Sequence, residues 1–278
     1  MGKVGRITRS WTKEEDQYVI SNYGDKTCSE IANDLDRTLY SIRKRLPVLG
    51  LSKSAKKYEY NENYFEEIDT EDKAYWLGFL SADGCIVDTS KGSKRVQLIL
   101  KESDKSHLEK FVKCIDGNIP VRLRKQNVNG KEYGSSKLVV HSTKMSNDLI
   151  KHGVHPRKTY DIQFPNINNS LVQHYLRGLI DGDGTLYVNK NKSPNRKTYK
   201  MSIEIASTSK KHLESIQEWF QEIGVDSGIY PTHNHFKLSM GSMNSIKVTI
   251  DNLYKNSNIY LDRKYEKAKE MISLMPSP

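Results

Sequence analysis

The chain has 278 residues, and its 44 Lys and Arg against 34 Asp and Glu give a formal net charge of +10. This basic balance favours a polyanionic partner. Three widely spaced cysteines argue against a disulfide framework and lack the spacing of a zinc site. No apolar run approaches the ~20 residues that span a bilayer, and the N-terminus lacks the apolar segment of a signal peptide. We therefore expect a soluble intracellular protein with no membrane partner.

The first 50 residues predict three short helices. Thr12 and Glu15 have the spacing of a capping box, so the first helix is expected to begin there. The second is expected over residues 29–35, and the third from Thr38 to Pro47. Three short helices with a basic third one are the outline of a helix-turn-helix, whose last helix enters the major groove of DNA. We expect DNA contact there, and the alternative is a helical subdomain with a solvated basic face. The basic residues are Arg43, Lys44 and Arg45.

The rest of the chain contains one stretch twice. Residues 74–84 read AYWLGFLSADG and residues 174–184 read HYLRGLIDGDG. The Tyr, the first Gly, the last Asp and the closing Gly of the two copies match at a constant spacing along the chain. Each copy predicts a helix, with Thr70 or Ser170 as its N-cap, that ends at the Asp-Gly.

Small residues four apart, such as Gly78 and Ala82, lie on one face of each predicted helix. Two such helices can pack closely, and Asp83 and Asp183 would then emerge together at their C-terminal ends. A helix C-terminus is partially negative, and neighbouring like charges raise each other's pKa. A divalent cation removes both penalties, and oxygen ligands suit Mg²⁺, Mn²⁺ or Ca²⁺. A single Asp-Gly is also typical of a plain helix stop, but two copies in one register favour a metal site.

At these residues the chain resembles the LAGLIDADG homing endonucleases, in the form where one chain carries both motifs. The resemblance covers roughly residues 60–270 and implies that Asp83 and Asp183 are the catalytic metal ligands. It also implies a lysine beside the scissile phosphate, a position that Lys144 matches and at which the second copy offers Ser242. The first 50 residues resemble the small Myb-like or helix-turn-helix modules that accompany some mobile-element nucleases.

The same order of elements is predicted after each copy of the repeated stretch. Each motif helix is followed by two strands, a helix, two strands and a last helix, so each half reads α-β-β-α-β-β-α. Residues 189–198 are expected to form a loop between the first two strands of the second half. Residues 153–158 and 259–264 close the two halves in parallel positions. We predict an α+β fold of two pseudo-symmetric αββαββα repeats with DNA-facing antiparallel sheets, preceded by a small three-helix domain. The predicted domains are residues 1–57, 58–160 and 161–278.

The predicted strands alternate between apolar and polar side chains. Val96, Leu98 and Leu100 are expected to face the helices, which leaves the intervening side chains on the other face of the sheet. On such a face Arg and Lys can bind guanine or phosphates, Gln adenine and Glu cytosine. An ordinary solvated face is the alternative. The candidate DNA contacts are Arg95, Gln97, Lys101, Arg122, Arg124, His141, Lys200, Glu204, His235 and Lys237.

The resemblance implies a monomeric, site-specific endodeoxyribonuclease acting on double-stranded DNA. It would use Mg²⁺, with Mn²⁺ or Ca²⁺ as substitutes, to make a double-strand break at a long asymmetric target. A DNA-binding regulator that does not cut, and a maturase that binds the RNA of its host intron, are the alternatives. Retention of both motif aspartates argues against the regulator. The expected compartment is the cytoplasm or nucleoid of a bacterial or phage-infected cell, or an organelle matrix.

Overall fold

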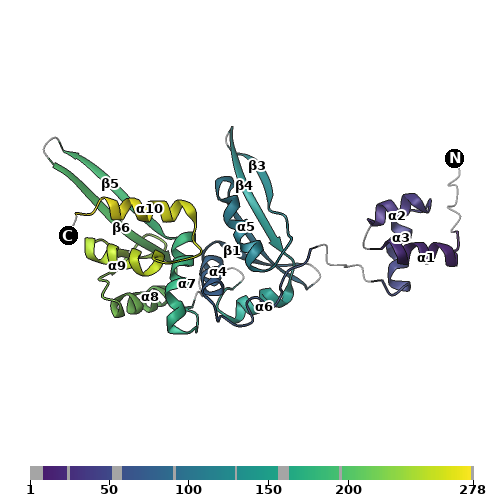
Figure 1. Cartoon of the computed structure of the whole chain (residues 1–278), viewed down its shortest axis with the longest axis horizontal. Coiled ribbons are helices and arrows are strands. Elements are labelled where there is room, and N and C mark those ends of the chain that lie inside the picture. Colours follow the sequence, from purple (N-terminus) through teal and green to yellow (C-terminus); the bar gives the residue numbers. More distant parts are fainter. Residues whose placement is uncertain are drawn as a thin grey trace. The chain divides into compact units, whose positions relative to one another are not determined.

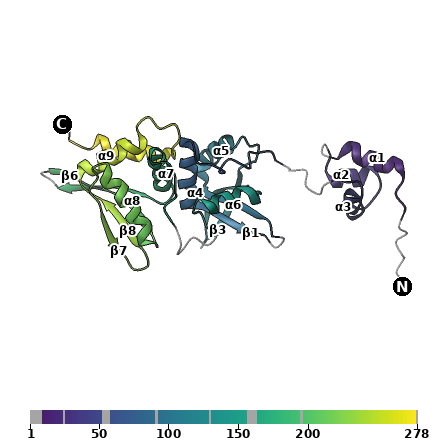
Figure 2. The same cartoon turned by 90° about the horizontal axis from the view of Figure 1, so that it is seen from below.

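The computed structural model divides the chain into two compact units, Met1–Tyr58 and Glu59–Pro278. The first unit contains α1 to α3, and the second contains α4 to α10 with two antiparallel sheets (Figures 1 and 2). No helix in the described part of the chain is both long and apolar enough to cross a membrane. The structure describes residues 9–23, 26–51, 58–89, 92–128, 130–155, 163–193 and 196–276.

Helix-capping residues set the helices of the first unit. The predicted capping box is confirmed, because Glu15 N donates to Thr12 Oγ1 and Thr12 N donates to Glu15 Oε2. A second capping box, which we did not predict, begins the next helix at Thr27. The third helix ends at Val48, one residue past the predicted stop at Pro47, so the proline lies in its last turn. The helices are α1 (Lys13–Asn22), α2 (Cys28–Asp34) and α3 (Leu39–Val48).

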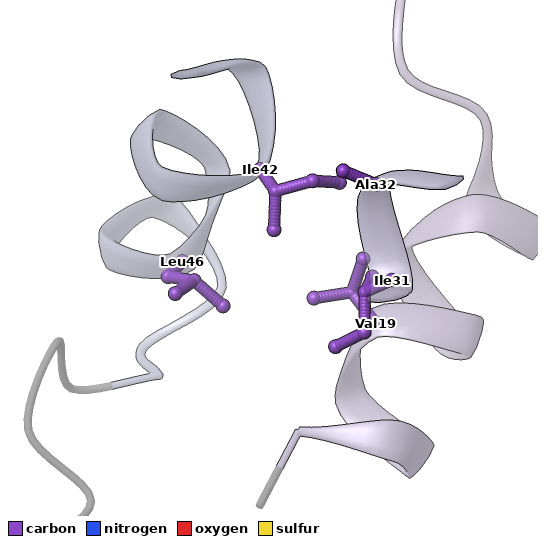
Figure 3. Close-up of a cluster of buried hydrophobic side chains, with 5 residues drawn as sticks. All are labelled: Val19, Ile31, Ala32, Ile42 and Leu46. Carbon is purple, nitrogen blue, oxygen red and sulfur yellow. The ribbon is translucent and has the colours of Figure 1, made fainter. Parts of the chain in front are cut away.

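A small hydrophobic cluster holds these three helices together. One side chain comes from α1, two from α2 and two from α3, and all five are at most 3% exposed (Figure 3). Burial of aliphatic side chains contributes roughly 1.5–3 kcal/mol each, so this cluster is the main stabilising feature of the unit. Its members are Val19, Ile31, Ala32, Ile42 and Leu46.

The second unit has the predicted α-β-β-α-β-β-α order twice, which confirms the two-repeat fold. One further helix, α10 (Asp262–Ser273), follows the second repeat. The first repeat consists of α4 (Glu71–Asp83), β1 (Gly84–Asp88), β2 (Lys94–Lys101), the short 3₁₀ helix η1 (Glu102–Asp104), α5 (Lys105–Cys114), β3 (Arg122–Val128), β4 (Lys131–Val140) and α6 (Thr143–Lys151). The second consists of α7 (Asn169–Gly182), β5 (Thr185–Ser193), β6 (Arg196–Ser207), α8 (Lys210–Glu222), β7 (Gly228–Pro231), β8 (Phe236–Met240) and α9 (Met243–Tyr254).

Each repeat forms one four-stranded antiparallel sheet, with strand orders β1-β2-β4-β3 and β5-β6-β8-β7. The predicted alternation in β2 is confirmed: Val96, Leu98 and Leu100 are buried, while Ile99 between them is 47% exposed. The expected loop over residues 189–198 is wrong. β5 and β6 continue there as a long hairpin whose register runs to Ser193 opposite Arg196. The sequence there is polar and lacks the apolar alternation by which we assigned strands. The strands form nevertheless, because the hydrogen bonds between them join backbone atoms.

Close packing of α4 against α7 joins the two repeats (Figure 1). A Cβ atom on Gly78 would lie 1.9 Å from Tyr175 O, and one on Gly178 would lie 2.0 Å from Tyr75 O. The predicted small-residue contact between these helices is therefore confirmed. Thr70 caps α4 as expected, whereas α7 is capped by Asn168 and not by Ser170.

Glycine at the end of each motif is required by the close approach of the chain to its own helix. Gly84 has φ −74°, an extended backbone that any residue adopts. A Cβ atom there would lie 2.6 Å from Leu80 O, and one on Gly184 would lie 2.6 Å from Ile180 O. The strand leaves each helix too closely for a side chain, so steric space and not a left-handed turn requires glycine.

Candidate active site

Asp83 and Asp183 both lie at the C-terminal ends of the paired helices. Asp83 is the last residue of α4, and Asp183 is the C-cap of α7. Asp83 Oδ2 lies 3.5 Å from the position that a Cβ atom on Gly182 would occupy, so its carboxylate lies against the end of the other helix. Asp83 is half-buried and Asp183 is exposed. The fold thus brings both carboxylates to one place that solvent can reach.

Lys264, from α10, lies at the same place. Its Nζ donates to Ile180 O at 3.3 Å and to Gly184 O, at the end of α7. The residue is only 8% exposed, and burial lowers the pKa of Lys264 to about 8. The carboxylates of Asp181, Asp83 and Asp183 oppose that decrease. The bonds to Ile180 O and Gly184 O place the ammonium group at the backbone on either side of Asp183.

Sequence reasoning missed Lys264 as a site residue. The sequence feature that could have indicated Lys264 is an Arg-Lys pair at equivalent positions near the end of each half, residues 157–158 and 263–264. Residues 157–158 lie outside the described part of the structure. For a lysine with a pKa near 8, the protonated and neutral forms differ little in free energy at neutral pH. Such a group can give up or accept a proton during a reaction.

Asp181, two residues before the exposed aspartate of the same motif, is fully buried. It accepts hydrogen bonds from Tyr75 OH at 2.8 Å, Tyr254 OH at 2.6 Å and Leu261 N at 2.7 Å. Burial raises the pKa of Asp181, and these three donors oppose the rise. Ser81 occupies the same position in the first motif, and its hydroxyl donates to Leu77 O within its own helix. The first acidic position of the second motif therefore joins α4, α7 and α9 to the segment before α10.

Residues 259–263, which lead into α10 and form its first turn, are held by side chains from both repeats. Besides the bond of Leu261 N to Asp181, four hydrogen bonds to these residues come from charged groups, and such bonds are the stronger class. These contacts fix the direction in which Lys264 enters the site. They are Arg177 Nε to Ile259 O (2.8 Å), Lys110 Nζ to Tyr260 O (3.1 Å) and to Asp262 Oδ1 (2.7 Å), and Arg263 Nε to Asp104 Oδ2 (2.8 Å).

The donor set at the ends of α4 and α7 fits a hard divalent cation. Among the described residues, no group of three or more His, Cys, Asp or Glu side chains is placed to hold a metal. Mg²⁺ is typically bound by one or two carboxylates together with waters and substrate phosphates. Asp83 and Asp183 are two carboxylates of that kind, and water or a substrate would complete such a ligand set.

Lys144 lies in the first turn of α6, where it forms ion pairs with two acidic side chains. Its Nζ is 2.8 Å from Asp148 Oδ2 and 3.4 Å from Glu66 Oε2, and the bond to Asp148 raises the pKa of Lys144. The catalytic role of Lys144 stays a prediction. Its expected counterpart was wrong, since Ser242 caps α9 just as Ser142 caps α6, so that Asn244 corresponds to Lys144.

Comparison with known proteins decides the type of fold. Residues 170–263 match the family model of the LAGLIDADG-like domain. This stretch starts in α7 and includes Asp181 and Asp183. No curated protein sequence matches the chain.

Solved structures of LAGLIDADG endonucleases share the fold over most of this chain. The homing endonuclease I-WcaI bound to its DNA recognition sequence has 14% identity and a TM-score of 0.52, covering 80% of this chain and 97% of its own. The LAGLIDADG homing endonuclease I-LtrWI bound to target DNA has 14% identity and a TM-score of 0.52, covering 77% and 90%. I-SmaMI bound to an uncleaved DNA target in the presence of calcium ions has 13% identity and a TM-score of 0.50, covering 74% and 90%. The chain therefore has the LAGLIDADG fold.

The sheet faces of this LAGLIDADG fold carry the sequence-predicted DNA contacts. In β2, Arg95, Gln97 and Lys101 alternate with the buried apolar residues, as predicted. Lys137 lies on the same face of β4, opposite Arg122 in β3, and was not among our candidates. The other candidates are also at least partly exposed: Arg122, Arg124, His141, Lys200, Glu204, His235 and Lys237.

In the first unit, the three basic residues of α3 differ in their surroundings. Arg43 and Lys44 are exposed. Arg45 instead donates to both oxygens of Asp16, at 2.7 and 2.6 Å, and so stabilises the packing of α3 on α1. A groove of about 590 Å³ runs beside α3, where Tyr40 is 70% exposed. The accessible cationic face of α3 therefore consists of Arg43 and Lys44.

Proposed function

We propose that the protein is a site-specific endonuclease that makes a metal-dependent double-strand break in DNA and acts as a monomer. One observation carries this proposal: the aspartates of two repeats meet at the ends of α4 and α7, with a buried lysine beside them. The fold shared with endonucleases bound to DNA supports it. A pair of acids on a pseudo-twofold axis would serve both strands of a duplex.

Asp83 and Asp183 would hold a divalent cation, Mg²⁺ in the first place, with Mn²⁺ or Ca²⁺ as substitutes. The bound cation would lower the pKa of a water and neutralise phosphate oxygens. The C-terminal ends of α4 and α7 carry partial negative charge beside the two carboxylates. Together they would attract a cation more strongly than two exposed carboxylates alone. The calcium present with uncleaved DNA in the I-SmaMI structure agrees with a hard cation in this fold.

Lys264 Nζ would hold positive charge, or a transferable proton, beside the phosphate bound at the aspartate pair. Its pKa of about 8 keeps both forms accessible near neutral pH. Lys144 is a second proposed catalytic residue, and it must exchange its ion pairs with Asp148 and Glu66 for a phosphate before it acts. Such exposed pairs are weak because solvent screens them, so this exchange costs little free energy.

Two sheet faces and α3 would bind the duplex. Cationic side chains hold phosphates and set the position of the protein, whereas Gln97 and Glu204 are suited to read adenine and cytosine edges. The remaining proposed contacts are Arg43, Lys44, Arg95, Lys101, Arg122, Arg124, His141, Lys200, His235 and Lys237, whereas Arg45 is held by Asp16.

Selection from a random duplex library tests the proposal. The protein is incubated with the library in Mg²⁺, and cut molecules are captured by adaptor ligation and sequenced. We expect one long asymmetric sequence, cut in both strands, and no product when EDTA replaces Mg²⁺. Binding of the selected duplex in Ca²⁺ is measured in parallel. Failure to cut any sequence in Mg²⁺ or Mn²⁺ would contradict the enzyme and leave a DNA-binding regulator.

A further inference from the structure

Gln97 and Glu204 occupy equivalent places in the two sheets. Gln97 in β2 lies opposite Cys85, the residue that directly follows the closing glycine of the first motif. Glu204 in β6 lies opposite Thr185, the residue that directly follows the closing glycine of the second motif. Because the strand register is the same in both repeats, the side chains around these two residues can be compared place by place.

The side chains around Gln97 on the face away from the helices are apolar. Cys85 lies opposite Gln97 on one side, and Val139 lies opposite it on the other. Ile99, two residues further along β2, lies on the same face and is 47% exposed. Side chains directly opposite each other are about 5 Å apart and diagonal ones about 7–8 Å, so these three surround one amide. We call Cys85, Ile99 and Val139 the apolar patch.

The side chains around Glu204 at the corresponding places are polar or smaller. Thr185 lies opposite Glu204 on one side, and Ser239 lies opposite it on the other. Ala206, two residues further along β6, corresponds to Ile99. The two sheets therefore share one register, but only the first has an apolar patch at this place.

Aliphatic side chains on a solvent-exposed sheet face are stabilised when another apolar surface covers them. In the major groove of DNA, the apolar group that base edges present is the C5-methyl group of thymine, and a glutamine amide can bind adenine through two hydrogen bonds. Arg95 and Lys101 lie on the same face of β2, and their positive charge suits the phosphates of a duplex. The polar and apolar groups of this face thus match an A·T-containing sequence.

We propose that the apolar patch binds the methyl groups of thymines next to the adenine that Gln97 contacts. The part of the target that the first sheet contacts, its half-site, would therefore require thymine at one or two neighbouring positions. The half-site of the second sheet would have no such requirement at the equivalent positions, since Thr185, Ala206 and Ser239 offer little aliphatic surface. This inference rests on the DNA binding of the proposed function, and it gives a reason for an asymmetric target.

Replacement of single thymines by uracil in the selected duplex tests the inference on the wild-type chain. Uracil keeps the hydrogen-bonding groups of thymine and lacks only the methyl group. Binding of each substituted duplex is measured in Ca²⁺ by fluorescence anisotropy. We expect binding to weaken about 3- to 5-fold at one or two neighbouring thymines of one half-site, which is the effect of burying one methyl group. Uracil at the equivalent positions of the other half-site should leave binding unchanged.

Ile99→Ala removes most of the exposed aliphatic surface of the patch. We expect this variant to bind the thymine duplex and the uracil duplex with equal affinity at the sensitive position. Leu123→Ala is the matched control, because Leu123 is 52% exposed in the same sheet but lies opposite the buried Ser136, on the other face. The control should keep the full loss of affinity on uracil substitution. Each comparison is made between two duplexes with one protein, so it does not depend on the folded fraction of a variant.

Three results would contradict this account. Equal affinity of thymine and uracil duplexes at every position, or a full uracil effect in Ile99→Ala, would overturn the inference while leaving DNA binding intact. A selected target with no thymine in either half-site would overturn it in the same way. A wild-type protein that selects and binds no duplex would instead overturn the proposed function itself.

Discussion

At the scale of single residues, the contact between α4 and α7 depends on two glycines. A methyl group at residue 178 would lie 2.0 Å from Tyr75 O, which belongs to a helix backbone and cannot rotate away. We expect Gly178→Ala to lower the free energy of unfolding by about 3 kcal/mol, in the upper range for overpacked sites. Urea denaturation of the second unit measures the change.

Gly241→Ala is the control for that substitution. Gly241 has no atom within 4 Å of an added methyl group, and its backbone does not require a positive φ. We expect this variant to be as stable as the wild type. If Gly178→Ala were equally stable, the close helix contact would be wrong.

Two buried histidines make the second unit sensitive to acid. His107 and His212 contact the motif tyrosines Tyr75 and Tyr175, and burial lowers the pKa of His107 to about 3 and of His212 to about 4. An unfolded histidine titrates near 6.5, so the unfolded state binds more protons below that pH. The contribution of these two histidines to the free energy of unfolding is therefore fully present above pH 6.5 and is lost as the pH decreases towards 4.

His212→Gln should reduce this acid sensitivity. Glutamine does not titrate, so the variant should lose less stability than the wild type between pH 6.5 and pH 4, whatever its stability at pH 7. Urea midpoints at a series of pH values measure the slope. Parallel slopes for variant and wild type would show that His212 is not neutral in the folded protein.

Some residues of the candidate site could be predicted from the sequence, and others could not. Asp83 and Asp183 were found because a duplication marks them twice in one register. Lys264 was missed because its closeness to them depends on the path of α10, which no local pattern records. Ser242 was wrongly paired with Lys144 because the β4–α6 and β8–α9 junctions are both polar, and only the N-caps of the two helices fix how they align.

At the scale of elements, Asp181 controls the entry of α10 into the site. Asn in its place has only one oxygen acceptor for Tyr75, Tyr254 and Leu261 N, so a tyrosine hydroxyl must turn from donor to acceptor and the charge-assisted bonds become neutral ones. We expect Asp181→Asn to slow single-turnover cleavage roughly 10- to 100-fold through misplacement of Lys264, with unchanged DNA binding in Ca²⁺. Quenched-flow cleavage at 20 °C measures the rate.

Ser81→Ala is the matched control at the equivalent position. The Ser81 hydroxyl donates to Leu77 O within α4 and also bonds to Tyr175 of α7. Neither partner lies in the segment before α10, so we expect cleavage near the wild-type rate. In addition, Asp181→Asn should have no further effect in a Lys264→Met background if it acts through that lysine. A full additive loss in the double variant would assign Asp181 a structural role only.

The order of elements was predictable, whereas several boundaries were not. The repeated motif and the alternation in β2 were enough to place helices and strands in each half. The hairpin of β5 and β6 was assigned to a loop because its end is polar and stabilised by backbone bonds. The N-cap of α7 was misplaced because Asn168 and Ser170 are both good caps and the choice depends on the preceding chain.

At the scale of the whole molecule, the two units have separate hydrophobic cores. The cluster of the first unit contains no residue from the second. We therefore expect two unfolding transitions, of which Ile42→Ala shifts only one, by about 2–4 kcal/mol. Trp11, which lies 4.1 Å from the Arg37 guanidinium, reports the first unit by fluorescence, and Trp76 and Trp219 report the second.

Circular dichroism in urea, compared with the fluorescence of a Trp11→Phe variant, separates these transitions. One transition for both probes, moved as a whole by Ile42→Ala, would mean that the units unfold together. The predicted boundary at residue 57 stays a prediction, as does a DNA-binding role for α3, because neither follows from the shared fold of the second unit.

Cleavage by the two aspartate variants is the most direct test of the central claim. The selected duplex is cut under single-turnover conditions in Mg²⁺ with both strands labelled, and binding is measured in Ca²⁺. We expect Asp83→Asn and Asp183→Asn each to lose on the order of 10³-fold or more in cleavage rate while binding the duplex as tightly as the wild type. A wild-type rate in either variant would contradict the assignment of a shared metal site at the ends of α4 and α7.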